Sequence, residues 1–434
     1  MYIKVHVYNC VYQNAQRGRY KRGDMKDVAI VGGGLAGGLL SVALAHAGFS
    51  CIVIDAAPPE KMKTAGFDGR TSAIAYACAR MYRRLNLWDA IAPHAEPIKD
   101  ILVTDGDLAS PSRRGGVAGG FLHFDSRELG ADEPLGWIIE NRLLRNAIFE
   151  AIDAHPNIEL IAPAACEKTT PGHSGASLEL RDGRTNKARL VVAADGKRSR
   201  LAAAAGIRAF NWGYGQSGLV ATVAHERPHN GVAQEYFLPS GPFAILPMTD
   251  NRSSLVWTEK TAAAEAYIAS DTEVFLEAIK TRFGDYLGAV HLSGPRWCYP
   301  LGLSFSHKFY GPRLALVGDA ARAIHPIAGQ GYNLGLKDIA ALVDVLSEAR
   351  RVGLDIGDEG VLARYDQWRR FDSAALALGT DVLNRFFSND FGPAKHLRRF
   401  GLGLVNRVQP LKIAFMKESG ADLGRLPSLL QAQG

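Results

Sequence analysis

The sequence predicts an α/β protein in which a discontinuous parallel-sheet domain is interrupted by a mainly β domain and followed by a helical C-terminal segment. Three observations lead to this prediction. Apolar strands end in a glycine-rich turn or in Asp-Gly and Gly-Asp pairs at residues 27–55, 190–200 and 314–319. Alternating apolar and polar residues between the last two segments indicate β-strands. From residue 361 the apolar spacing becomes helical.

Length and composition are typical of a two-domain globular enzyme. The 434 residues exceed what one hydrophobic core usually holds, and 22% charged residues is an ordinary fraction for such a protein. The cysteines are scattered and never spaced C-x-x-C, which favours a reducing compartment over a disulfide framework or a zinc site. No apolar run is long enough to predict a membrane-spanning helix. We therefore expect a cytoplasmic location and no metal site.

Positive charge is concentrated at the two ends of the chain. Residues 1–24 contain five basic residues and one acid, and residues 391–434 contain seven basic residues and two acids. Because no basic stripe with interleaved aromatic residues crosses the central region, we expect no nucleic-acid partner. Basic ends suit an anionic membrane surface or an acidic partner protein, and a solvated tail is the alternative.

The glycine-rich turn near the start of the chain predicts a dinucleotide site. In DVAIVGGGLAGGLLSVALAHAGFSCIVID, residues 27–55, a strand leads through G-x-G-x-x-G into a helix and a second strand that ends in an acid. The glycines permit a tight turn, let a diphosphate reach the N–H groups of the helix N-terminus, and let the helix pack on the strand. The terminal acid accepts hydrogen bonds from a ribose, which leaves NAD or the ADP half of FAD. The predicted contacts are Gly32, Gly34, Leu35, Ala36, Gly37 and Asp55.

Two later strand ends favour FAD over NAD. The strand LVVAA is followed by Asp-Gly, and the strand LALV by Gly-Asp. A plain NAD site needs only the first turn, whereas a ribityl chain and a flavin ring need further strand ends. The turn GQGYN, residues 329–333, leads into a helix whose dipole favours an anionic flavin. The predicted contacts here, to a non-covalent FAD, are Asp195, Gly196, Gly318, Asp319 (to the ribityl hydroxyls), Gly329, Gly331 and Asn333.

This combination of motifs resembles the group A flavoprotein monooxygenases, which have the para-hydroxybenzoate hydroxylase fold. The stretches FDGRTSAIAYACARMYRRLNLWDAI (residues 67–91) and HPIAGQGYNLGLKD (residues 325–338) are similar to the ubiquinone-biosynthesis hydroxylases of the UbiH, UbiF and VisC type. The tail pattern with TDVLNRFFS and RRFGLGLVNRVQPLKIAFM fits the same family. The resemblance spans residues 25–420.

The resemblance implies a metal-free aromatic-ring monooxygenase. The family uses NAD(P)H to reduce the flavin and dioxygen to form a flavin hydroperoxide, which attacks an electron-rich ring such as a phenol. The implied substrate is a polyprenyl phenol of ubiquinone biosynthesis. A ubiquinone-biosynthesis protein complex and the inner face of the cytoplasmic membrane are further implied partners.

Residue roles can be transferred by position. The resemblance assigns Arg70 to the FAD diphosphate, and Asn141 and Arg142 to a helix start that contacts the cofactor from the other side. It assigns Asp195 and Gly196 to both FAD and nicotinamide binding. A surface ion pair for Arg70, an exposed helix position for Arg142 and a simple turn for Asp195 are the structural alternatives.

The catalytic candidates lie in the second glycine-rich turn. Pro326 and Gly329 are candidates for the floor beside the ring, and Gln330 follows them. His325 is a candidate for proton transfer, with a structural hydrogen bond as its alternative. On the strands of the predicted second domain, residues such as Phe243 are more often core than ligand contacts.

We expect a Rossmann-like FAD-binding domain at residues 25–98, 136–206 and 301–360. A mainly β substrate domain is expected at residues 99–135 and 207–300, a helical region at 361–434, and a basic, disordered extension at residues 1–24. The basic amphipathic tail is expected either to pack on the core or to contact a membrane surface.

Two rival functions remain compatible with these patterns. One is another flavoenzyme: an FAD-dependent hydroxylase of another aromatic substrate, a reductase, or a halogenase, although the Trp-x-Trp-x-Ile-Pro stretch of flavin halogenases is absent. The other is a non-catalytic scaffold subunit of a quinone-biosynthesis assembly. The intact glycines and both strand-end aspartates favour an active cofactor site over a scaffold.

Overall fold

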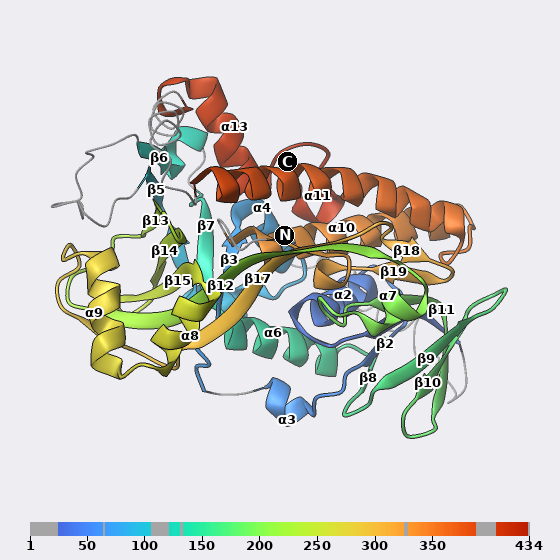
Figure 1. Cartoon of the computed structure of the whole chain (residues 1–434). Coiled ribbons are helices and arrows are strands. Elements are labelled where there is room, and N and C mark those ends of the chain that lie inside the picture. Colours follow the sequence, from blue (N-terminus) through green and yellow to red (C-terminus); the bar gives the residue numbers. More distant parts are fainter. Residues whose placement is uncertain are drawn as a thin grey trace, which may run out of the picture.

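The computed structural model describes residues 25–63, 66–105, 121–130, 133–324, 329–387 and 405–432. The expectations for residues 1–24, for His325 and Pro326, and for part of the basic tail lie outside the described residues. The described residues form three β-sheets with helices packed on their faces (Figure 1).

The first sheet has a parallel centre. The strand order is β8, β2, β1, β11, β19: β8 (Ile158–Ile161), β2 (Cys51–Ile54), β1 (Lys26–Val31), β11 (Thr185–Ala193) and β19 (Leu314–Leu316). Antiparallel strands extend it: β9 (Cys166–Pro171), β10 (Ala176–Leu180) and β18 (Tyr310–Gly311). The central strands are nearly continuous apolar runs because helices cover both faces of a parallel sheet.

The second sheet is mainly antiparallel and follows the order β20, β17, β12, β15, β14, β13, β5, β6, with β16 paired to β12. Its strands are β5 (Asp100–Asp105), β6 (Phe121–Asp125), β12 (Ala209–His225), β13 (Val232–Leu238), β14 (Gly241–Met248), β15 (Arg252–Lys260), β16 (Val290–Leu292), β17 (Trp297–Ser306) and β20 (Arg322–Ala323). The third sheet contains β3 (Thr71–Ala75), β7 (Gly136–Glu140) and β4 (Glu96–Ile98).

Long helices cover the first sheet, and shorter ones cover the second (Figure 1). The long helices are α2 (Leu35–His46), α6 (Asn141–Ala154), α10 (Gln330–Arg351) and α11 (Glu359–Phe387). The others are α3 (Pro59–Met62), α4 (Tyr76–Arg84), α5 (Trp88–Ile91), α7 (Arg200–Ala204), α8 (Thr261–Ala269), α9 (Thr272–Phe283) and α13 (Gln409–Ser419). Four 3-10 turns complete the described helical elements: η1 (Ala92–His94), η2 (Ser126–Leu129), η3 (Gly318–Ala320) and η5 (Ser428–Leu430).

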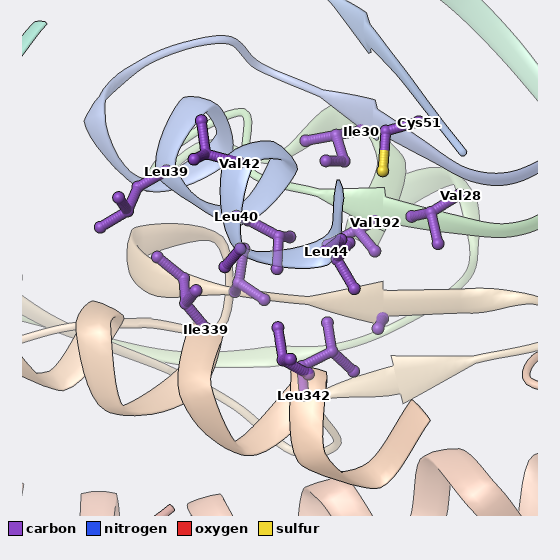
Figure 2. Packing of buried hydrophobic residues seen from close by; sticks show 14 of the residues in the cluster. Val28, Ile30, Leu39, Leu40, Val42, Leu44, Cys51, Val192, Ile339 and Leu342 are labelled. Atoms are coloured by element: carbon purple, nitrogen blue, oxygen red, sulfur yellow. The ribbon is translucent and has the colours of Figure 1, made fainter. Parts of the chain in front are cut away.

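The main hydrophobic core lies where α2 and α10 pack on the parallel strands. Figure 2 shows Leu40 and Leu44 of α2 in the same packed layer as Val192 of β11 and Leu342 of α10, and all four are fully buried. Burying such a side chain completely stabilises the fold by about 1.5–3 kcal/mol. This core therefore fixes the N-terminal ends of both helices relative to the strand ends.

The second sheet carries a separate apolar cluster on each face. On β13, Leu238 belongs to one cluster and its neighbour Phe237 to the other, because successive side chains of a strand alternate between faces. The outer apolar cluster lies under α8 and α9. It contains Leu219, Ala221, Val223, Leu238, Phe243, Ile245, Leu255, Trp257, Ala264, Phe275, Ile279, Phe283, Leu287 and Val290. The inner apolar cluster contains Ile98, Leu122, Phe124, Leu135, Ile138, Ala233, Phe237, Met248 and Met416, with Phe67, Ala73, Ile101, Val103, Leu129, Leu246 and Val405 packed against it.

A buried ionic network joins α10, α11 and the strand ends of the first sheet. The Asp338 carboxylate is completely buried and accepts hydrogen bonds from Arg322, from Nε of Arg369 at 3.0 Å and from the Gly318 N–H at 3.0 Å. Arg369 also pairs with Asp372, whose side chain is 40% exposed. Two arginines and a carboxylate are tolerated in the interior because their opposite charges pair, although Nε of Arg322 and Nη2 of Arg369 find no hydrogen-bond partner among the described residues.

The predicted fold class is confirmed: a mixed α/β sheet domain is combined with a mainly β sheet and a helical C-terminal segment. The division into domains stays a prediction. Its expected boundary at residue 301 falls within β17, which lies in the second sheet as far as Ser306.

We predict that Asp338→Asn lowers the free energy of unfolding by about 3–5 kcal/mol, because Arg322 loses its buried counter-charge and Arg369 keeps only the partly exposed Asp372. Asp372→Asn is the matched control. It removes a partly exposed partner of Arg369 and is expected to cost no more than about 1 kcal/mol. Urea unfolding of the two variants measures the difference, and equal losses would contradict a structural role for Asp338.

Candidate cofactor and active site

Two glycines of the first turn are required by close packing. Gly32 has a φ of +104°, and a Cβ atom there would lie 2.3 Å from the Ala194 carbonyl oxygen. A Cβ atom on Gly37 would lie 1.8 Å from the Gly32 carbonyl oxygen. The turn, the end of β11 and the first turn of α2 therefore approach one another as closely as backbone allows.

Gly34 is different, because packing does not require a glycine at this position. It precedes α2 with a φ of −64°, which any residue can adopt, and a Cβ atom there would meet nothing within 4 Å. No side chain caps this helix end, and its first turn contains no acid. The open space lies at the positive end of the helix dipole, beside Leu35 and Ala36. This is the environment that a diphosphate group needs.

Asp55 lies at the end of β2 and faces the same turn. Its Oδ2 accepts a hydrogen bond from the Gly33 N–H at 2.6 Å, and its Oδ1 accepts one from the Ala57 N–H at 2.7 Å. Both donors are backbone groups. They hold the carboxylate in place, and neither carries a positive charge that would neutralise it. Its remaining lone pairs can accept hydrogen bonds from ribose hydroxyls.

The second predicted strand end lies next to the first. Gly318 has a φ of +60°, and a Cβ atom there would lie 3.4 Å from Cβ of Ala36 in α2. Asp319 follows in η3 with a solvent-accessible side chain. Protein surrounds Asp319 on several sides, and this partial desolvation raises the pKa of its carboxyl group despite the nearby Arg322 and Lys197. The carboxylate is therefore accessible to a ligand, although the surrounding protein removes part of its hydration.

Asp195 and Gly196 lie directly after β11. The Asp195 Oδ2 accepts a hydrogen bond from the Arg200 N–H at 2.9 Å, whereas its Oδ1 is buried and has no partner among the described residues. A buried carboxylate oxygen without a donor is costly. A ligand hydroxyl or amide would satisfy it. Gly196 has a φ of +85°, which a glycine adopts without strain.

The N-terminus of α10 lies over β3. Gly329 has a φ of +63°, and a Cβ atom there would lie 3.0 Å from Cβ of Ala73, while Gly331 has open space. The Asn333 side chain is buried and bonds to the backbone of β3, accepting from the Ala75 N–H at 3.0 Å and donating to the Ala73 carbonyl at 3.0 Å. The amide of Gln330 donates to the Ser419 carbonyl at 3.0 Å. Asn333 thus positions the helix start that is predicted to face the flavin.

Arg70 and Asn141 lie at neighbouring positions. The Asn141 N–H donates to the Arg70 carbonyl at 3.0 Å, and its Oδ1 accepts from the Ser72 hydroxyl at 2.7 Å. The Arg70 guanidinium is 45% exposed and pairs with Asp68 at 2.7 Å. A partly exposed arginine with one carboxylate partner can still reach a phosphate group.

The Arg142 side chain is engaged within the protein. Its Nε lies 2.5 Å from Oε2 of Glu140, which is buried and also accepts from Arg252 at 2.9 Å. Arg252 begins β15, so Glu140 ties the third sheet to the second. This role of Glu140 was missed in the sequence, because no local pattern links these three residues.

The described motifs therefore meet in one place. The turn after β1, the end of β11, the end of β19 and the start of α10 are adjacent, as expected when the carboxyl ends of parallel strands share one edge of a sheet. Phe243, in contrast, lies in the outer apolar cluster and is core. Open helix ends, two strand-end carboxylates and an unsatisfied buried oxygen fit a long dinucleotide with a second ring system. The fold and this site are those of an FAD-binding flavoprotein.

Comparisons with known proteins agree. The family model described as FAD binding domain matches residues 25–377. The chain is 48% identical over 397 residues to the ubiquinone hydroxylase UbiL of Rhodospirillum rubrum, covering 92% of this chain and 90% of that protein. It is 34% identical over 393 residues to the 3-demethoxyubiquinol 3-hydroxylase of Escherichia coli, covering 90% and 97% of the two chains.

A solved structure shows the same fold. The p-nitrophenol 4-monooxygenase PnpA of Pseudomonas putida superimposes with a TM-score of 0.75 at 18% identity, covering 93% of this chain and 99% of that one. The chain belongs to the FAD-dependent monooxygenases of the ubiquinone hydroxylase family, which confirms the predicted family and enzyme class.

We predict that Gly34→Ala separates cofactor binding from folding. A methyl group there meets no atom of the described residues within 4 Å, so the free energy of unfolding should change by no more than about 1 kcal/mol, while the approach of the diphosphate to α2 is blocked. After desalting, the variant should lack flavin absorbance and keep the circular dichroism of the parent. Gly37→Ala is the comparison and is expected to impair folding itself. A Gly34→Ala protein that retains FAD would contradict the assignment.

We predict that Asp319→Ala weakens FAD binding by about 10- to 100-fold, because the hydrogen bonds to the ribityl hydroxyls are lost. The same change should stabilise the FAD-free protein at neutral pH. A raised folded-state pKa means that the charged carboxylate is disfavoured in the fold, so the penalty develops as the pH rises from the unfolded-state pKa to the folded-state pKa and is fully present above it. Flavin titration and unfolding at pH 4 and pH 7 measure both effects, and an unchanged dissociation constant would refute the role.

Proposed function

We propose that the protein hydroxylates the aromatic ring of a polyprenyl phenol in ubiquinone biosynthesis, with NAD(P)H as the reductant and dioxygen as the oxygen source. The balanced reaction converts the ring C–H, dioxygen, NAD(P)H and a proton into the ring C–OH, NAD(P)+ and water. The observation that carries the cofactor part of the proposal is the open N-terminus of α2 at Gly34, with Gly318, the residue before Asp319, close to Ala36 in the first turn of the same helix. The names of the two relatives supply the substrate class.

Each part of the site has a distinct role in this reaction. The α2 N-terminus binds the diphosphate, Asp55 the adenosine ribose, and Asp319 the ribityl chain. The unpaired Oδ1 of Asp195 would accept a hydrogen bond from the cofactor, and Arg70 would support the diphosphate. When bound, FAD supplies the redox chemistry that activates dioxygen for transfer of one oxygen atom to the ring.

The protein's contribution to the chemical step is electrostatic and steric. The N–H groups at the start of α10, beside Gly329 and Gly331, favour negative charge next to them. Asn333 fixes that helix start against β3, and Gln330 is held by the Ser419 carbonyl. The inner apolar cluster excludes water on the side of Ala73. Pro326 remains the candidate floor beside the ring, and His325 the candidate for proton transfer.

The hydrophobic substrate must be delivered to this site. None of the helices that the structure describes is long and apolar enough to cross a bilayer. We propose either peripheral contact with the inner face of the cytoplasmic membrane or delivery within a ubiquinone-biosynthesis protein complex. Lys412 is not available for such a contact, because it is buried and lies 2.5 Å from Glu128.

We predict that the FAD-loaded protein, supplied with NAD(P)H and a short-chain prenyl phenol under ¹⁸O₂, forms a product that contains one labelled oxygen atom. The label follows because one oxygen atom enters the ring and the other leaves as water. Mass spectrometry of the extracted phenol provides the measurement, and Gly34→Ala is the control without cofactor. If the protein consumes NAD(P)H but forms only hydrogen peroxide and no labelled phenol, the proposal is wrong.

A further inference from the structure

The two faces of the second sheet are covered by different parts of the chain. The outer apolar cluster takes alternate residues of the central strands, such as Leu219, Ile245 and Trp257, and these point toward α8 and α9. The residues between them therefore lie on the inner face. Ala233 and Phe237 of β13 belong to this face, because both are buried in the inner apolar cluster.

A row of accessible side chains crosses the inner face. Strand pairing places its members side by side, one on each strand: Val103, Glu235, Ala244, Val256, Val220 and Trp297. The first five are partly exposed, and Trp297 is 36% exposed. The two neighbouring rows are mostly buried and contain Ala233, Ser254 and Thr222 on one side, and Phe237, Thr258 and Gly218 on the other. We call the six accessible residues the open row.

The open row borders the predicted ring position. In the adjoining buried row, the Ser254 hydroxyl accepts a hydrogen bond from the Thr71 hydroxyl at 3.0 Å, so β3 covers that row. Ala73 lies two residues further along β3 and adjoins Gly329, where a Cβ atom would lie 3.0 Å away. Successive rows on one face of a sheet are about 7 Å apart. The open row therefore lies one row beyond β3, next to the start of α10.

Glu235 is the one charged side chain among these six. Its neighbours on the adjoining strands are Val103 and Ala244, and Val256 and Val220 continue the row beyond Ala244. Ala233 and Phe237, two residues away on its own strand, are also apolar. An apolar surface with a single acid suits a hydrophobic molecule that carries a hydrogen-bond donor, as a prenylated phenol does.

We propose that Glu235 is a catalytic residue that takes the proton of the phenol hydroxyl while the ring is hydroxylated, and that the rest of the open row contacts the prenylated ring. The inference rests on the proposed function, because it needs a phenol substrate. As oxygen is transferred, the ring loses electron density and the phenol O–H becomes strongly acidic. That O–H bond breaks, its electron pair stays on the substrate oxygen, and an O–H bond forms on the Glu235 carboxylate.

Glu235→Gln tests the chemical role. The amide keeps the size of the side chain and still hydrogen-bonds to a hydroxyl, but it cannot take up the proton. In the full-length, FAD-loaded protein with a short-chain prenyl phenol, kcat for hydroxylation should fall by about 100-fold or more. KM for the phenol should change by less than about threefold, because binding is retained. FAD content should be that of the parent, and Glu235→Asp should recover part of kcat.

Tyr236→Phe is the matched control. Tyr236 is the next residue on β13, but its side chain packs against the outer apolar cluster. Loss of its hydroxyl should therefore leave kcat unchanged. The inference is overturned if Glu235→Gln keeps the parental kcat. It is also overturned if the rate of this variant falls only in proportion to lost FAD, because Glu235 would then be structural.

Val256→Phe tests the open row without chemistry. The added ring occupies the space in front of the row, so phenol binding, measured by the change in flavin absorbance on titration, should weaken at least about tenfold. Val274→Phe adds the same bulk on α9, where Val274 is 55% exposed on the other side of the sheet, and should bind the phenol like the parent. Equal binding by both variants would contradict the open row as the phenol site.

Binding and turnover together separate this inference from the proposed function. If the parent hydroxylates the phenol and Glu235→Gln does so equally well, the role of Glu235 is wrong and the proposed function stands. If the parent binds the phenol at a site that Val256→Phe blocks but forms no hydroxylated product, the proposed function fails and the open row remains the phenol-binding surface.

Discussion

The buried carboxylate of Asp338 is the constraint on which the second half of the cofactor site depends. It receives the N–H of Gly318 at the end of β19, the guanidinium of Arg322 from β20 and that of Arg369 from α11. Because Asp338 itself belongs to α10, one side chain sets the distance between that helix and the strand end that carries Asp319. In a desolvated network no partner can relax into water, so the arrangement forms as a unit.

The glycines of the site serve two purposes that the structure separates. At Gly32 and Gly37 the neighbouring backbone occupies the space that a side chain would need. At Gly34 and Gly331, which lie at helix N-termini, no atom of the described residues comes within 4 Å of the Cβ position. Packing explains the first pair, and room for a ligand explains the second. No described side chain caps the start of α2 or of α10, so both helix dipoles would favour an elongated anionic ligand bound beside them.

Much of the fold and cofactor site could be predicted because the signals are local. The turn after β1 and the acid at Asp55 occur within one continuous stretch, in which strand, glycine and helix patterns agree. The remainder depends on contacts between distant segments. Nothing near Asn333 indicates that its amide bonds to β3, and nothing near Arg142 reveals that Glu140 also binds Arg252.

The same reason explains the difference at the C-terminus. The net charge of the tail does not distinguish its basic residues from one another. In the fold, Lys412 is buried against Glu128, whereas Arg407 is exposed to solvent. Helical spacing distinguishes the faces of α13, but which face meets the protein depends on η2 and the inner apolar cluster. Which side chain a basic residue pairs with depends on the fold, so it cannot be predicted from composition alone.

The distance along the chain between the two halves of the site has a consequence for biosynthesis. Ribosomes add about 5–20 residues per second, so Asp319 and α10 follow Gly37 by an interval on the order of tens of seconds. Before α10 is synthesised, Leu40 and Leu44 of α2 lack the helix that packs against them in the folded protein. The two halves of the predicted FAD site can therefore come together only after α10 has been synthesised, and the first strand, turn and helix must wait for the second half of the site.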